Sequence, residues 1–427
     1  MFTILMVLFF TGMPVAFAFI TFNFIGIYIW MGGTSGFMLV VRSAFNVLNN
    51  FILAPIPLFV LMGMILFHSG FGWRVIDSLD KWIGRMPGRL SLLSVLAGTV
   101  FAVISGVPMG TAAMLGSVFI PEMRNRGYSK NMTIGPILGG GSLSLIIPPS
   151  AMAVIVGGIA EVSIAHLLIS IIVPGLILSA LFVIYIFIFS MLHPEEAPKY
   201  MVGAGSFREK IKALSYIIPL AAVVFLVTGV IFFGMATPTE AAATGALASF
   251  ILVAVYRKLS RGALKKTILE SARVTVMVMF IIVGSIAFSQ LLAFTGCTHA
   301  LARLGSEATL SPIVVVILMQ LVVLILGFFM DLMGISMITI PIFMPVINAL
   351  GINPVWFCTL LLINLGTALI TPPFGLLLFT MKGVAPKDIS MLDIIYAAIP
   401  YFIMGIITIA LVLCFPGLAL WLPGFMK

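Results

Sequence analysis

The chain has 427 residues, of which 62% are hydrophobic and only 8% are charged. A soluble fold cannot bury that much apolar surface, so the composition indicates a polytopic membrane protein. The formal net charge is +9, but the basic residues lie in loops and leave no aromatic-interleaved basic surface, so nucleic-acid binding is not indicated.

Apolar stretches of roughly 17 residues or more, long enough to cross a hydrocarbon core, occur along the whole chain. They lie at 14–30, 51–68, 131–160, 165–192, 214–233, 238–256, 274–292, 354–381 and 391–415. Each is expected to be helical, because an isolated strand cannot satisfy its backbone in lipid. Segments 36–50 and 257–273 are expected to be amphipathic interfacial helices. Residues 1–11 lack a signal-peptide pattern and are expected in the mature protein.

Most Lys and Arg residues fall in five groups, at 74–89, 124–130, 199–212, 257–273 and 382–387. Basic loops are retained in the cytoplasm, so all five groups are expected on the inner side.

This loop pattern predicts two re-entrant helical hairpins. The chain between Arg89 and Arg124 is too short for two full crossings, which need about 40 apolar residues, so a hairpin enters from inside and bends at 105–110. In the second half the matching loop holds only Arg303, so a second hairpin enters from outside and bends at 330–336. The two halves then have opposite orientation, as in the inverted repeats of many secondary transporters.

Helix-breaking residues recur at an offset of 224 residues, as expected for a duplication. Pro14, Gly110, Pro121 and Pro148-Pro149 are matched by Pro238, Gly334, Pro345 and Pro372-Pro373. The chain is therefore predicted to be an all-α polytopic membrane protein with an inverted structural repeat, 1–213 and 214–427.

Each predicted repeat has three parts. The first holds scaffold helices within 1–68, a hairpin and broken helix within 90–160, and a helix at 165–192. The second holds scaffold helices within 214–292, a hairpin and broken helix within 311–384, and a helix at 389–421.

The two Pro-Pro pairs lie in the segments 139–150 and 364–374 and are predicted to break membrane helices. Proline donates no backbone hydrogen bond and disfavours helix in the residue before it, so upstream carbonyls are set free. Unwound backbone at membrane depth is tolerated only where it is buried or lines a cavity, and carbonyls with Ser or Thr hydroxyls suit a dehydrated Na⁺. The alternative is a packing kink with small residues for close helix approach.

Asp331 is the only carboxylate that lies inside an apolar stretch rather than near its end. Burial of such a group is unfavourable unless it is paired or bound to a cation, so Asp331 is a candidate ion ligand. The alternatives are a protonated carboxyl and one at the mouth of the bend. Its counterpart at the 224-residue offset is Val107, so two ion sites would not be identical. Glu240, in Thr237-Pro-Thr-Glu240, is predicted to cap a helix instead.

Signatures of other chemistry are missing from the sequence. The three cysteines have no metal-ligand spacing, and the four histidines are scattered. The sequence has no H-E-x-x-H motif, no G-x-S-x-G elbow and no G-x-x-x-x-G-K-[ST] phosphate loop. The chain is therefore not expected to be an enzyme or to bind a nucleotide.

In their order along the chain, these residues resemble the large membrane subunit of the tripartite ATP-independent periplasmic (TRAP) transporters, of the sialic acid and C4-dicarboxylate type, within the ion transporter superfamily. The resemblance spans essentially the whole chain and is carried by Ser105-Gly106, Pro121-Glu122, Ile147-Pro-Pro-Ser150, Thr237-Pro-Thr-Glu240, Met330-Asp331, Pro341-Ile-Phe-Met-Pro345 and Thr371-Pro-Pro373. It implies an elevator-type, sodium-coupled importer in a bacterial or archaeal inner membrane. It also implies two partners, a small four-helix membrane subunit and a periplasmic substrate-binding protein.

The resemblance further implies at least two sodium ions and their ligands. One sodium site would use Ser105 with backbone near Gly140, Gly141 and Ile147, and a second would use Asp331 with Gly366, Thr367 and Thr371. The solute would lie between the two bends, with Thr111, Ser150 and Asn364 as polar contacts. The first bend departs from the family, because Val107-Pro-Met109 stands where members often carry Ser or Ala.

The expected solute is an organic acid. Family substrates include sialic acids and C4-dicarboxylates, and of these sialic acid is the predicted solute, although no arginine clamp lies at either broken helix. The rival interpretations are a stand-alone sodium-coupled dicarboxylate carrier of the same superfamily, a passive channel and an intramembrane enzyme. A stand-alone carrier would work without a binding protein, a channel would conduct single-channel currents, and an enzyme would need a nucleophile and base that the sequence lacks.

Overall fold

The computed structural model describes residue 13 and residues 15–84, 86–105, 108–198, 207–297, 311–328, 330–372 and 375–426. Helices and short 3-10 turns make up the regular structure of these ranges, and no strand occurs in them, as the all-α prediction requires. Seven helical segments among them are long and apolar enough to cross a membrane. The predictions for residues 1–11, Pro14, Gly106, Val107, Arg303 and Pro373 lie outside the described residues.

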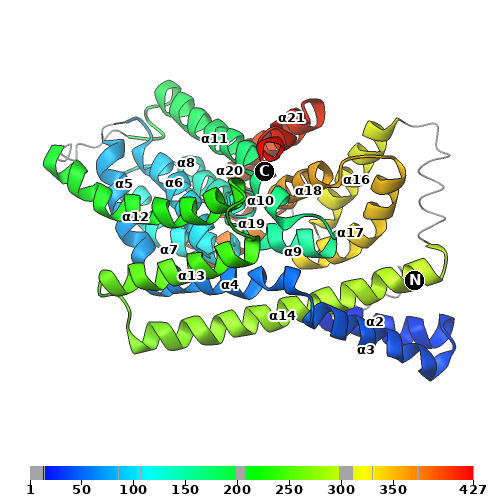
Figure 1. The fold of residues 1–427 in the computed structure, drawn as a ribbon. Coiled ribbons are helices and arrows are strands. Elements are labelled where there is room, and N and C mark those ends of the chain that lie inside the picture. The colour runs from blue at the N-terminus through cyan, green and yellow to red at the C-terminus, as the bar shows by residue number, and fades with distance from the viewer. Residues whose placement is uncertain are drawn as a thin grey trace.

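A scaffold layer runs along the lower side of the molecule (Figure 1). It consists of α2 (Val15–Trp30), α3 (Met38–Leu48), α4 (Pro55–His68), α13 (Pro238–Val255) and α14 (Arg261–Phe294). The ring of Phe288 on α14 packs edge-on against Phe19 and Phe22 of α2, with centroid distances of 5.5 and 5.6 Å. These aromatic contacts between α2 and α14 join the first half of the chain to the second.

One predicted boundary in this layer is wrong. Residues 257–273 do not form a helix of their own, because α14 continues without interruption over 34 residues. The chain has neither Gly nor Pro between residues 263 and 283, so nothing breaks the backbone hydrogen bonding there. In the first half, by contrast, Asn49 and Asn50 end α3 before Pro55 starts α4.

Two helical hairpins lie at opposite ends of the molecule (Figure 1). One is α6 (Arg89–Ser105) with α7 (Pro108–Asn125), and the other is α16 (Pro312–Leu326) with α17 (Leu332–Ala349). The bounds of α7 and α17 differ by 224 residues at both ends, which matches the offset of the helix-breaking residues. The orientation of the halves in a membrane stays a prediction.

The second bend was placed a few residues too late. It was predicted at 330–336, but α17 begins at Leu332, so Gly334 and Ser336 are already helical. Asp331 starts the helix early because its side chain accepts a hydrogen bond from Gly334 N, as an N-cap residue does. At the first bend, predicted at 105–110, the chain becomes helical again at Pro108.

Both predicted helix breaks are confirmed. The first broken helix is α8 (Lys130–Ser142), the 3-10 turn η3 (Leu143–Leu145) and α9 (Ala151–Ile159). The second is α18 (Pro354–Ala368) and α19 (Leu376–Val384). The described residues between the helical pieces, 146–150 and 369–372, are not helical.

The remaining helices surround these parts. They are α5 (Phe71–Ile83), α10 (Ile164–Ser170), α11 (Ile172–Leu192), α12 (Phe207–Phe232), α20 (Met391–Cys414) and α21 (Gly417–Leu420). On α20 the ring of Tyr401 packs on α8, where a Cβ atom at Gly135 or Gly139 would lie 2.5 or 2.4 Å from it. Only glycine lets the aromatic ring come this close to the broken helix.

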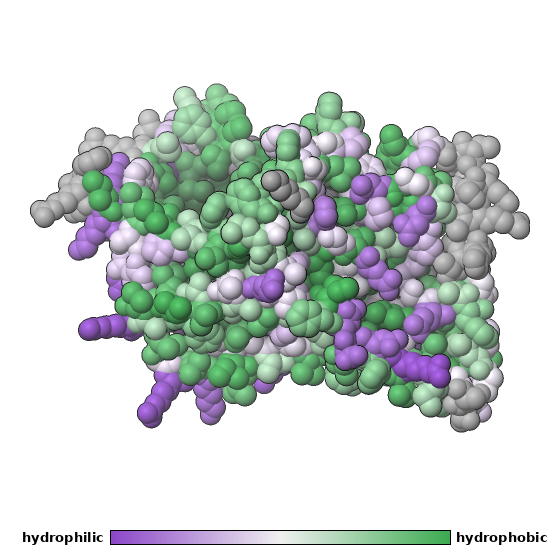
Figure 2. All heavy atoms as spheres, viewed as in Figure 1, coloured by the Kyte–Doolittle hydropathy of each residue, from purple (hydrophilic) through white to green (hydrophobic). Residues whose placement is uncertain are grey.

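Polar contacts tie segments in or next to the basic groups to parts of the chain far away in the sequence. These contacts are Trp82 to Lys210 O at 3.2 Å, Ser129 to Glu196 at 2.8 Å, Arg124 to Asp388 at 2.7 Å and His68 to Glu270 at 2.8 Å. Figure 2 shows hydrophobic residues over much of the visible face, with hydrophilic residues projecting at the left end, where α13 leads into α14, and a second hydrophilic cluster on the right half. The largely apolar surface suits a multi-pass membrane protein, and the placement of the basic loops on one side of the membrane stays a prediction.

Candidate functional site

A cavity of about 250 Å³ lies where both hairpin bends, the first broken helix and the scaffold meet. Pro108 and Met109 line it from the first hairpin, and Asp331 lines it from the second. Ala151 and Met152 line it from α9, and α4 and α14 close it on the scaffold side. The sequence predicts the solute between the two bends, and the cavity lies at that place.

Asp331 is the only ionisable side chain among the described residues that line the cavity. Its Oδ1 accepts a hydrogen bond from Gly334 N at 3.2 Å and caps α17. A capping carboxylate retains further lone pairs, so it can bind a cation while it holds the helix start. The interpretation as a carboxyl at the mouth of a bend is therefore compatible with a role as an ion ligand.

Serine hydroxyls hold the unwound part of the first broken helix. Ser142 donates to Gly139 O at 2.8 Å, and Ser144 donates to Gly141 O at 2.8 Å. Ser150 donates to Leu145 O at 2.9 Å and accepts from Ala153 N at 3.3 Å, so it closes the unwound loop and caps α9. A hydroxyl that donates its proton to a carbonyl still offers its lone pairs to a cation.

Threonine hydroxyls do the same in the second broken helix. Thr367 donates to Ile363 O and Thr371 to Thr367 O, both at 2.9 Å. The backbone N–H of Gly375 donates a hydrogen bond to Thr371 O at 2.9 Å. Thr367 and Thr371 are buried, so their oxygens face protein rather than lipid.

The glycines assigned to sodium sites also have a packing role. A Cβ atom at Gly140 would lie 3.0 Å from Gly98 Cα, and one at Gly141 would lie 3.3 Å from Ala112 Cβ. A Cβ atom at Gly366 would lie 3.0 Å from Ser142 O, so the two broken helices touch at this point. Close helix approach, the alternative interpretation of these small residues, is thus present in the structure.

Three predicted solute contacts are not brought together at the cavity. Asn364 is buried between α18 and α16, where its amide donates to Gln320 O at 2.6 Å and to Gln320 Oε1 at 2.9 Å. Thr111 is fully buried in α7, and Ser150 is occupied as described above. None of the three is among the described lining residues of the cavity.

Two predicted sodium ligands, Ser105 and Ile147, are not among the described residues that line the cavity. Ser105 ends α6 next to the first bend, but its side chain lies outside the described residues. Ile147 lies beside Ile172 and Leu176 of α11, in a different hollow from the cavity between the hairpin bends. Only its backbone was assigned to ion binding, and that assignment stays a prediction.

The methionines that line the cavity, among them Met109, Met152 and Met277, were not predicted as site residues. They come from α7, α9 and α14, and no short motif connects them. Among the residues that the structure describes, no group of three or more His, Cys, Asp and Glu could hold a metal ion.

A helical membrane protein with two hairpins, two interrupted helices and a cavity at their meeting point has the architecture of a secondary transporter. The chain belongs to the family described as "Tripartite ATP-independent periplasmic transporter, DctM component", whose model matches residues 2–418. This match confirms the family resemblance of the sequence.

Individual relatives agree with this assignment. The C4-dicarboxylate TRAP transporter large permease protein DctM of Pseudomonas aeruginosa is 32% identical over 383 residues, covering 90% of this chain and 88% of that protein. The sialic acid TRAP transporter large permease protein SiaM of Vibrio cholerae is 29% identical and covers 97% of this chain and 96% of that protein. These relatives are permease proteins, which confirms that the chain is not an enzyme.

Solved structures support the fold independently. The YdaH transporter of Alcanivorax borkumensis matches with a TM-score of 0.64 at 15% sequence identity, over 93% of this chain and 91% of that one. At this identity the likeness concerns the fold, which is that of a membrane transporter.

Proposed function

We propose that this chain is the large membrane subunit of a sodium-coupled importer of an organic acid. The observation that carries the proposal is the cavity between the two hairpin bends, because three helices begin at it. They are α7 at Pro108, α9 at Ala151 and α17 at Leu332. Helix N-termini carry partial positive charge. The start of α17 is offset by its own cap Asp331, so the starts of α7 and α9, which have no acidic residue in the first turn, are the ones that favour a carboxylate in a cavity without basic side chains.

The charges at this cavity support sodium coupling. Asp331 would repel an anionic solute unless a cation lies between them. The Thr and Ser oxygens of the two broken helices, together with nearby carbonyls, are hard ligands that suit such a cation. Two Na⁺ ions with one monoanion carry a net positive charge inward, and an inside-negative membrane potential then drives uptake.

An elevator movement is the mechanism that we assign to this architecture. The hairpins and broken helices would form the mobile part, and the scaffold layer the fixed part. Among the described residues, one hydrogen bond joins α14 to α17, from Ser285 Oγ to Met337 O at 3.5 Å. An interface that depends on apolar contacts rather than on fixed hydrogen bonds can slide at low cost, because one apolar contact replaces another.

The partners in this proposal are a small four-helix membrane subunit and a periplasmic substrate-binding protein, in a bacterial or archaeal inner membrane. The family description, which names a tripartite periplasmic transporter, supports both. The relatives' names print C4-dicarboxylate and sialic acid as solutes, so an organic acid is proposed. Sialic acid, the acid chosen from the sequence, stays a prediction.

The test is uptake into proteoliposomes that contain this chain with its small subunit, supplied with the binding protein. Asp331→Asn is expected to lower sodium-driven uptake by about 5- to 150-fold, the range that coupling free energies of 1–3 kcal/mol correspond to. Glu240→Gln is the matched control. Glu240 is also an acid at a helix start, but its carboxylate caps α13 through Thr237 and does not line the cavity.

Unchanged sodium dependence in Asp331→Asn would remove Asp331 from the ion site. Uptake without the binding protein would favour the stand-alone carrier instead. Single-channel currents in a planar bilayer would favour the passive channel.

A further inference from the structure

The cavity between the hairpin bends has an unusual lining for an acid-binding site. Six of its 18 described lining residues are methionines, whereas the whole chain has 27 in 427 residues. The six are Met62, Met64, Met109, Met152, Met277 and Met333. They come from α4, α7, α9, α14 and α17, so the enrichment is a property of the cavity rather than of one helix.

The lining offers almost no hydrogen-bonding side chains. Apart from Asp331, the described lining residues are apolar. The nearby hydroxyl of Ser150 donates to Leu145 O at 2.9 Å, and Ser150 is not among the described lining residues. A polyhydroxylated solute would leave its hydroxyls without partners here, and each such group weakens binding.

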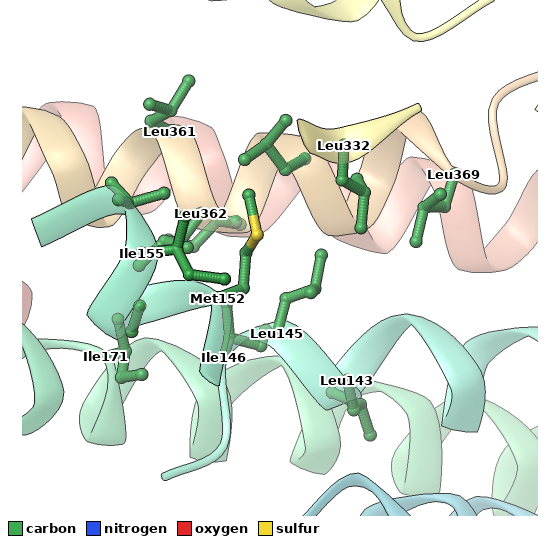
Figure 3. Packing of buried hydrophobic residues seen from close by; sticks show 14 of the residues in the cluster. Leu143, Leu145, Ile146, Met152, Ile155, Ile171, Leu332, Leu361, Leu362 and Leu369 are labelled. Carbon is green, nitrogen blue, oxygen red and sulfur yellow. The ribbon is translucent and has the colours of Figure 1, made fainter. Parts of the chain in front are cut away.

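The apolar side chains converge on one space. Figure 3 shows Leu145 and Met152 pointing toward Leu332 from the opposite side, so that the first broken helix and the second hairpin face each other. Methionine has a flexible, polarisable side chain that adapts to irregular or flat apolar groups. The volume of about 250 Å³ is below the roughly 300–1,000 Å³ common for small-molecule sites, so the solute is small.

The described part of the lining also has no basic side chain that could pair with a second carboxylate on the solute. No Lys or Arg is among the described lining residues. One carboxylate can face the starts of α7 and α9, but a second would be buried against the scaffold methionines without a partner.

Given the proposed function, on which this inference rests, we infer that the solute is a small monocarboxylate with an apolar aliphatic or aromatic body. The carboxylate faces the helix starts and the sodium-bound Asp331, and the apolar body contacts the methionines. A large polyhydroxylated acid such as sialic acid, and a C4-dicarboxylate, fit this lining less well.

The test measures binding to the purified complex of this chain with its small subunit, so that the selectivity of the binding protein does not enter. The probes are phenylpyruvate, N-acetylneuraminate and succinate, each titrated by calorimetry in NaCl and in KCl. Phenylpyruvate is expected to bind in NaCl at least about tenfold more tightly than the other two, because their extra polar groups stay unpaired.

Variants at Met152 locate the contact. Met152→Gln keeps the length of the side chain but adds an amide to the cavity, and is expected to weaken phenylpyruvate binding about tenfold. Met152→Leu keeps an apolar side chain and is expected to weaken phenylpyruvate binding less than Met152→Gln does. Met191→Gln is the matched control, since Met191 is exposed on α11 and does not line the cavity.

The outcomes separate this inference from the proposed function. Tighter sodium-dependent binding of N-acetylneuraminate or succinate would overturn the apolar-body inference and leave a sodium-coupled acid importer in place. Unchanged phenylpyruvate affinity in Met152→Gln would also overturn it. Failure of all three acids to bind, or equal binding in NaCl and KCl, would count against the proposed function itself.

Discussion

The hairpin of each half packs on its own broken helix, and the two halves do so by different chemistry. In the first half α6 meets α8 at two glycines, where a Cβ atom at Gly98 would lie 2.4 Å from Gly140 Cα. At the 224-residue offset these positions are Val322 and Asn364. There, α16 meets α18 through the amide of Asn364, which donates to Gln320 O at 2.6 Å. The positions of the helices repeat, whereas the contacts that hold them have diverged.

The cavity shows the same divergence. The first broken helix contributes Leu145, Ala151 and Met152 to the lining, whereas no described residue of α18 or α19 does so. The charged group comes instead from the second hairpin, at Asp331. A duplicated backbone thus provides two similar frames, both halves supply apolar lining, and only the second half supplies a charged group among the described lining residues.

The largest effect on stability is expected from breaking the glycine contact. In Gly98→Ala the new Cβ atom would meet the backbone of Gly140, which cannot rotate away, so α6 and α8 must separate. We expect a loss on the order of 3 kcal/mol, at the upper end of overpacking costs, measured as a lower melting temperature in detergent. Gly383→Ala is the control, because nothing lies within 4 Å of its added Cβ atom. Equal melting temperatures for the two variants would contradict the close contact.

A smaller effect is expected at the corresponding interface of the second half. Asn364→Leu removes both hydrogen bonds to Gln320 and is expected to cost about 1–2 kcal/mol, the range found for hydrogen bonds between membrane helices. The double variant with Gln320→Leu should cost less than the sum of the two single changes, because the partners act as a pair. Strict additivity would show that the amide contact contributes nothing specific.

The smallest effect on stability is expected at the N-termini of α9 and α19, where each broken helix becomes helical again. The two halves also differ there. Ser150 caps α9 with its side chain, whereas Gly375 begins α19 without a side-chain cap. Ser150→Ala should therefore cost about 1 kcal/mol, typical of a lost N-cap. Ser150→Thr, which keeps the hydroxyl, should restore most of the melting temperature. If it does not, the hydroxyl is not the stabilising group.

Much of the fold could be predicted from local chemistry. The breaks at the Pro-Pro pairs were predicted because proline lacks the N–H that a helix needs. The cap at Thr237 and Glu240 was predicted for a similar reason, and the structure contains that capping box. Asp331 was singled out because a carboxylate inside an apolar stretch requires an explanation.

The site was predicted less well than the fold. Asn364 was assigned to the solute on its position near a helix break, but its amide is used between two helices. Met109, Met152 and Met277 were not singled out, because a methionine in an apolar helix looks the same whether it faces lipid, protein or a cavity. The continuous α14 was divided at residue 273 because its charge changes there, although its backbone has no break.

The sequence by itself determined that this is a membrane protein built of helices, where those helices are interrupted, and which family it belongs to. These properties follow from the hydrocarbon core, which forces every backbone group into a local hydrogen bond, and from prolines that prevent one. Only the tertiary structure decided which side chains meet at the cavity. Met152 and Met277 are far apart in the chain, and in helices that are apolar on every side no pattern marks the inward face, so packing alone determines the direction in which each side chain points.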